Sequence, residues 1–174
     1  LKRLRGRPIS VAAYFIGKAY LVIVLMILQT ALLLGAGAAF FGLNLPTQAS
    51  KWFTFTWLIL LGSACSTVLG IAFSVVPKSG RGASAVVSPI VIILQFFSGV
   101  FFVFSQLPGW MQHFAALFPL KWLTQGMRSV FLPDSFASQE VAKNWELGRT
   151  SLILVLWLMV GLVISIKTFK WSKE

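Results

Sequence analysis

The sequence has few charged residues and very few acidic ones. Only 11% of its 174 residues are charged, and fifteen Lys and Arg stand against four Asp and Glu. An average soluble domain has about 25% charged residues. Because hydrophobic residues make up 57% and the mean hydropathy is +0.86, the composition excludes an ordinary soluble domain and predicts a protein of the lipid bilayer.

Residues that could support redox, metal or proton chemistry are also scarce. Cys65 is the one cysteine of the chain, so a disulfide framework and a cysteine-based metal site are excluded. His113, the one histidine, has no carboxylate or thiol at ligand spacing. No Asp, Glu, Arg or His lies deep in an apolar run, which argues against an ion-coupled carrier.

Long apolar runs are what the sequence does contain. A membrane-spanning helix needs about 20 mostly apolar residues. Four runs qualify or nearly so, at 19–43, 52–76, 84–104 and 150–167. The sequence therefore predicts an all-α integral membrane protein with four transmembrane helices.

Positive charge gathers at alternate ends of these runs. Residues 1–18 begin LKRLRGR, residues 77–82 read PKSGRG, and the tail 168–174 follows Lys167 with two further lysines. Cytoplasmic loops are the ones enriched in Lys and Arg. Both ends of the chain are therefore predicted to be cytoplasmic, with residues 105–149 on the outer side.

Small residues recur at every fourth position of the second run: Gly62, Ser66, Gly70 and Ser74. Such a stripe allows another helix to approach closely, although chance is an alternative because small residues are common in spans. Three milder polar residues, Gln29, Gln95 and Ser98, are weak candidates for a substrate path. Interhelical hydrogen bonds are the favoured role for the two glutamines.

Prolines divide residues 105–133 into two helical pieces, which begin near Pro108 and Pro119. Neither piece is long enough to cross a hydrocarbon core of about 30 Å. Leu120, Leu123 and Met127 share one face of the second piece with Val130 and Phe131, and Lys121, Thr124, Gln125 and Arg128 share the other. We therefore expect a re-entrant outer hairpin before the last span, followed by an exposed loop at 134–149.

Two stretches resemble the permease subunits of ABC-2 type exporters. They are LKRLRGRPIS, followed by Gly17–Lys18 before a span, and FFSGVFFVFSQLPGWMQHFAALFPLKWLTQGMR. The resemblance covers essentially the whole chain. It implies that the four runs are the third to sixth spans of a six-span domain, so that two spans are expected upstream. Phe118 stands where Asn is frequent, and Lys121–Trp122 where Thr–Tyr is frequent.

The resemblance also assigns candidate sites by position. Contact with the nucleotide-binding subunit is implied for Lys2, Arg3, Leu4, Arg5, Pro8, Gly17 and Lys18. The candidates for an outer hairpin that caps the export path are Leu107, Pro108, Trp110, Pro119, Leu120, Trp122 and Arg128. In this hypothesis the two tryptophans lie at the membrane interface, and Lys121 and Arg128 point to water or headgroups. The basic residues at the start could equally be a topological anchor.

What the resemblance implies for function is a non-enzymatic transport subunit in the inner or plasma membrane. It would form the path for a hydrophobic or amphipathic substrate, such as a drug, a lipid or a glycan. The expected partners are a separate ATPase subunit, which would bind ATP and Mg²⁺, and a second permease subunit, with no cofactor in this chain and no nucleic acid. The alternatives are an ion-coupled carrier or channel, and a membrane assembly protein that transports nothing.

Overall fold

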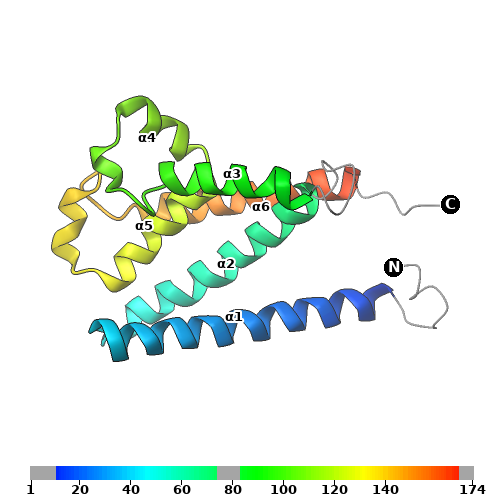
Figure 1. The fold of residues 1–174 in the computed structure, drawn as a ribbon, viewed down its shortest axis with the longest axis horizontal. Helices are drawn as coiled ribbons and strands as arrows, with labels where there is room; N and C mark the ends of the chain where they lie inside the picture. Colours follow the sequence, from blue (N-terminus) through cyan, green and yellow to red (C-terminus); the bar gives the residue numbers. More distant parts are fainter. Residues whose placement is uncertain (1–10, 74–82, 169–174) are drawn as a thin grey trace. The chain divides into compact units, whose positions relative to one another are not determined.

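The computed structural model describes residues 11–73 and 83–168, and these residues are all-helical without a strand, as the sequence predicts (Figure 1). The chain divides into two compact units, Leu1–Leu45 and Pro46–Glu174. Residues 1–10, 74–82 and 169–174 lie outside the described part.

The first unit holds one long helix, α1 (Val11–Phe41), whose segment Tyr20–Phe41 is long and apolar enough to cross a membrane. The helix ends where Gly42 takes a positive φ of 62° and the backbone N–H of Leu43 donates to the carbonyl of Gly37 at 3.0 Å. Helices often end at a residue with a positive φ, and glycine adopts this conformation readily because it has no Cβ to clash.

The second unit holds the remaining elements. In chain order they are α2 (Ala49–Phe73), α3 (Ala83–Phe97), η1 (Phe104–Gln106), α4 (Gly109–Ala116), α5 (Pro119–Phe131), η2 (Asp134–Gln139) and α6 (Leu147–Thr168). Within it, Ala49–Phe73 and Leu147–Lys167 are long and apolar enough to span. The run predicted at 84–104 is helical only to Phe97. With 15 residues, α3 rises about 22 Å, less than the hydrocarbon core of about 30 Å.

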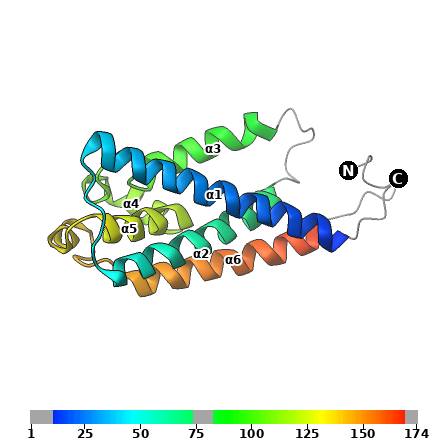
Figure 2. The ribbon, with the colours of Figure 1, turned by 90° about the horizontal axis from the view of Figure 1, so that it is seen from below.

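Helices α2 and α6 pack along each other and run in the same direction (Figure 2). Leu58 and Leu154 share a buried cluster near their beginnings, and the Ser165 hydroxyl donates to the Val68 carbonyl at 3.2 Å near their ends. A Cβ on Gly161 would lie 2.8 Å from a methyl group of Val68. A small residue at this position therefore permits the close approach of the two helices.

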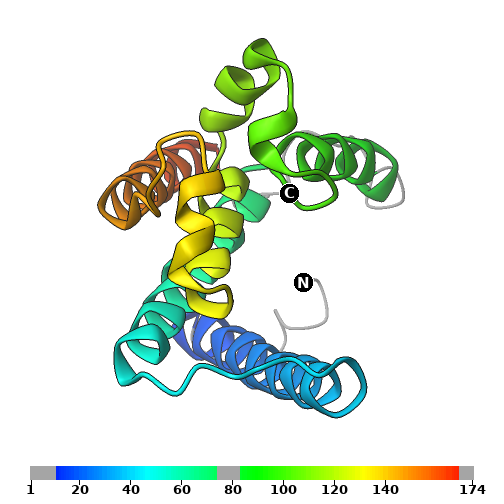
Figure 3. The same ribbon diagram turned by 90° about the vertical axis from the view of Figure 1, so that its left-hand side faces the viewer.

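Helix α5 packs on this pair, and α3 and α4 contact α5 in turn (Figure 3). Its apolar residues Leu123, Met127 and Phe131 lie against the buried cluster of Leu58, Val130 and Leu154, so this face was correctly assigned from its spacing. A Cβ on Gly126 would lie 2.6 Å from a methyl group of Leu58, which is fully buried. Glycine at position 126 thus brings the α5 backbone close to α2.

Candidate functional site

In the α4–α5 segment, residues 105–133, one helix follows each of the prolines Pro108 and Pro119. Pro108 is the N-cap of α4, and Pro119 is in the first turn of α5, where its missing N–H would have had no partner in any case. The helices have 8 and 13 residues, so they rise about 12 and 20 Å. The C-terminal end of α5 lies near the N-terminal ends of α2 and α6. The Lys51 ammonium of α2 donates to the Leu132 carbonyl at 3.1 Å, and Val130 shares a buried cluster with Leu154 of α6.

The polar face of α5 is buried, which contradicts the predicted orientation of two residues. Lys121 is 4% exposed and does not point to water or headgroups, and Trp122, at 3% exposed, is not at an interface. The Trp122 indole N–H donates to the carbonyl of Ala116 at 2.8 Å, inside the turn between α4 and α5. The end of α3 and the chain after α5 cover the polar face of α5. An amphipathic pattern in the sequence shows that a helix has a polar face, but not that other segments cover it.

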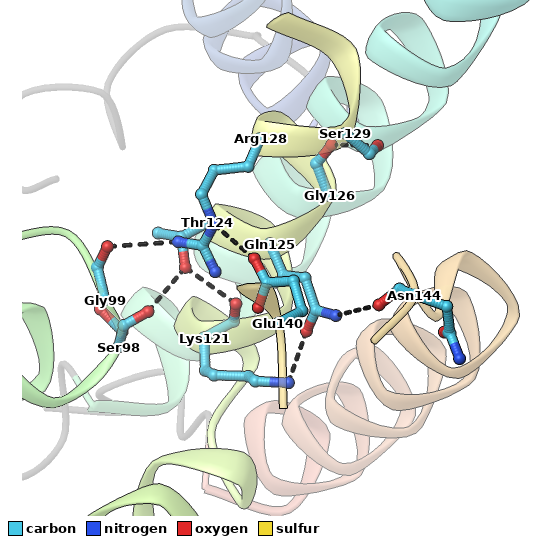
Figure 4. A network of polar contacts seen from close by, with 10 residues as sticks. All are labelled: Ser98, Gly99, Lys121, Thr124, Gln125, Gly126, Arg128, Ser129, Glu140 and Asn144. Carbon is cyan, nitrogen blue, oxygen red and sulfur yellow. Dashed lines mark hydrogen bonds and ion pairs between the residues drawn. The ribbon is translucent and has the colours of Figure 1, made fainter. Parts of the chain in front are cut away.

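Arg128 joins three segments through its guanidinium group (Figure 4). Its Nε lies 2.7 Å from Glu140 Oε1, after η2, and its Nη1 donates to the Gly99 carbonyl at 3.2 Å, after α3. Gly99 has a φ of 82°, a conformation that glycine adopts without strain. Charge-assisted hydrogen bonds are stronger than neutral ones, so Arg128 fixes both the turn and the loop against α5.

Thr124 and Ser98 add a second link between α5 and the end of α3. The Thr124 hydroxyl is 2.8 Å from the carbonyl of Ser98, and it is also 2.8 Å from the Lys121 carbonyl in its own helix. Ser98 is 2% exposed, and its hydroxyl donates to the Gln95 carbonyl at 3.2 Å. Ser98, a weak candidate for the substrate path, therefore lies in the packed contact between the end of α3 and α5.

The Lys121 ammonium lies in an aromatic and polar enclosure. It donates to Gln125 Oε1 and lies 3.6 Å from the centre of the Trp122 ring, within range of a cation–π interaction. Gln125 in turn donates to the Asn144 carbonyl at 3.3 Å. Burial lowers the pKa of Lys121 to about 8, although the charges of Glu146 and Glu140 act in the opposite direction.

Aromatic side chains attach α4 to its neighbours. The Trp157 indole N–H of α6 donates to the Leu117 carbonyl at 2.7 Å, and the Phe118 ring stacks on Trp157 at 6.1 Å. Trp110 is 67% exposed, with one ring edge toward Phe97 of α3. Of the two tryptophans predicted at an interface, only Trp110 is accessible in this way.

The remaining predicted residues are distributed over both units. Gly62 lies under Leu123 of α5, whereas Ser66 and Gly70 are exposed and Ser74 is outside the described residues, so the proposed stripe stays a prediction. Gln29 is exposed on α1, and Gln95, Leu107 and Leu120 are half-buried. Of the seven coupling candidates, Lys2, Arg3, Leu4, Arg5 and Pro8 lie outside the described residues, and Gly17 and Lys18 lie in α1.

Sequence reasoning missed Glu140 and Trp145, which it placed in an exposed loop, whereas Asn144 of the same loop is indeed exposed. Glu140 is only 9% exposed. The small number of acidic residues could have pointed to Glu140. A basic residue in an apolar segment needs an acidic partner, and the chain has only four acidic residues. Among the described residues, no three His, Cys, Asp or Glu side chains gather where they could share a metal ion.

The fold and the buried network define a multi-pass helical membrane protein with a compact, non-spanning α4–α5 segment. Residues 1–132 match the family model of the ABC-2 type transporter, and the chain belongs to this family. It is therefore a membrane permease of ABC-type transport, a transport subunit that is not itself catalytic. No curated protein and no solved structure gives a significant match to the chain.

We expect Glu140→Gln to destabilise the second unit, because Arg128 keeps its charge in a mostly buried place and loses its counter-ion. The expected loss is about 1–3 kcal/mol in the free energy of unfolding, measured by thermal unfolding of the purified permease in detergent. Asp134→Asn is the matched control, since Asp134 pairs with Lys51 but is 74% exposed. It should cost less than about 1 kcal/mol. Equal losses of unfolding free energy in the two variants would show that Glu140 is not the buried counter-ion of Arg128.

The lowered pKa of Lys121 predicts a specific pH dependence. Between about 8 and 10.5 the folded protein binds fewer protons at Lys121 than the unfolded chain, so stability rises with pH across this window and is level below it. From pH 7 to pH 10 the gain is about 2 kcal/mol, or roughly 5 °C in Tm. In Lys121→Met the rise should be smaller by this amount. The same slope in both proteins, measured in the same detergent, would show that Lys121 is not the group responsible.

Proposed function

We propose that the chain is the permease subunit of an ATP-driven exporter and forms the path for a hydrophobic or amphipathic substrate of the drug, lipid or glycan class. The observation that carries the proposal is the family match over residues 1–132 of a chain with several spanning helices. ATP and Mg²⁺ bind to a separate ATPase subunit, a partner that the family generally has. Two permease subunits, most simply two copies of this chain, enclose the path.

In the proposed topology both ends of the chain are cytoplasmic. The basic segments 1–7 and 77–82, together with the lysines from Lys167 onward, support this because cytoplasmic loops are rich in Lys and Arg. The parallel course of α2 and α6 agrees with it, because the C-terminal ends of both helices, each followed by basic residues in the sequence, then lie on the same side. The basic residues before α1 contact the ATPase subunit.

The α4–α5 segment caps the outer end of the path in this proposal. Its support is its position at the N-terminal ends of α2 and α6 and its attachment to α3 through Arg128 and Thr124. Because α5 is tied to α2, α3 and α6, a tilt of any of these helices is transmitted to the cap. Trp110, exposed on α4, is placed to contact substrate or lipid there.

The test is export by membrane vesicles that contain this permease and its ATPase partner. Replacing the phosphate-loop lysine of the partner should reduce export at least about 100-fold, because that residue contacts the nucleotide phosphates. An ionophore that collapses ion gradients should leave ATP-driven export unchanged. Export that survives the inactive ATPase but stops with the ionophore would identify an ion-coupled carrier instead.

A further inference from the structure

Two cavities of different character adjoin in the second unit. One, of about 390 Å³, lies between α3 and α4 and is lined by apolar side chains, among them Ile93, Phe97 and Met111. The other, of about 300 Å³, is lined by both charged and aromatic residues, including Arg128, Glu140 and Trp145. Phe102 lines both, so a molecule that occupies one cavity can extend into the other past a single side chain.

Two of the side chains that line the second cavity each carry a buried hydrogen-bond donor that has no acceptor among the described residues. They are Arg128 Nη2 and Trp145 Nε1, and neither has a hydrogen-bond partner within residues 11–73 and 83–168. The Arg128 guanidinium contacts Glu140 through Nε and Gly99 through Nη1, and neither contact involves Nη2. Buried donors without acceptors are rare and costly, so two of them on side chains that line one cavity favour the binding of a ligand with acceptor oxygens there.

The charges of this cavity restrict what that ligand can be. Arg128 and Glu140 lie side by side, so the pair carries no net charge, and a strongly anionic group would meet the carboxylate as well as the guanidinium. A headgroup with one negative and one positive group matches both side chains. The neighbouring cavity is lined by apolar residues, so it fits a hydrocarbon chain of the same molecule.

We propose that the two cavities bind one zwitterionic phospholipid as a resident lipid, with its phosphate at Arg128 and Trp145, its ammonium at Glu140, and an acyl chain between α3 and α4. Arg128 Nη2 and Trp145 Nε1 are covered by protein atoms in this structure. Phe102 lines both cavities and is 54% exposed, so its side chain has room to move when the lipid enters. This site does not depend on the proposed export function, since the lipid is a bound component and not cargo.

The test measures lipid binding to the purified full-length permease by native mass spectrometry after removal of endogenous lipid. Dioleoyl phosphatidylethanolamine should bind at least about tenfold more tightly than dioleoylglycerol, which lacks the phosphate and ammonium, or glycerophosphoethanolamine, which lacks the chains. Phosphatidylglycerol of the same chains should bind more weakly, because it brings a negative charge without a positive one. Equal binding of the headless lipid, or tighter binding of phosphatidylglycerol, would overturn the proposal.

Trp145→Phe keeps an aromatic ring and removes the indole N–H, so it should weaken phosphatidylethanolamine binding about tenfold. Trp57→Phe is the matched control, because Trp57 packs on the Leu58, Val130 and Leu154 cluster and lines neither cavity. Met111→Gln, in the apolar cavity, should weaken the diacyl lipid but not the chain-free headgroup. If Trp145→Phe binds the lipid as tightly as the unchanged protein, water satisfies the two donors and the site is not a lipid site.

Discussion

The guanidinium of Arg128 is the contact on which the arrangement of the α4–α5 segment depends. It holds the turn at Gly99 and the carboxylate of Glu140 against one helix, and so connects the end of α3, α5 and the chain that enters α6. In a low-dielectric environment such contacts are strong when complete and costly when a partner is lost. The buried polar groups around Arg128 therefore favour one arrangement of these segments over alternatives.

Because both faces of α5 are covered, the α4–α5 segment is part of the helix bundle and not a loose loop on its surface. One face contacts Leu58 and Leu154, and the other contacts Ser98, Gly99 and Glu140. A transport cycle that tilts α2 or α6 must carry α5 along or break these contacts. The more exposed α4, with Trp110 on its surface, is attached mainly through aromatic side chains and the hydrogen bond from Trp157.

The sequence predicted those features that depend on local chemistry. Hydropathy indicated the long helices, prolines indicated where α4 and α5 begin, and a 3.6-residue period indicated that Leu123 and Met127 face the core. It did not predict that Lys121 is buried, because a lysine on a polar helix face normally points to water. Part of its cover comes from residues that are distant in sequence, among them Phe104 and the chain after position 139. The early end of α3 was also missed, since FFSGVFF is apolar throughout and the turn at Gly99 depends on Thr124 and Arg128.

The direct test of this account is hydrogen–deuterium exchange of the permease in lipid nanodiscs, resolved to peptides that cover residues 119–131 and 134–139. If both faces of α5 are packed as described, its amides exchange as slowly as those of α2 and α6, whereas the exposed η2 exchanges far faster. Exchange of α5 as rapid as that of η2 would show that the polar contacts of Arg128, Thr124 and Lys121 do not hold it in the bundle.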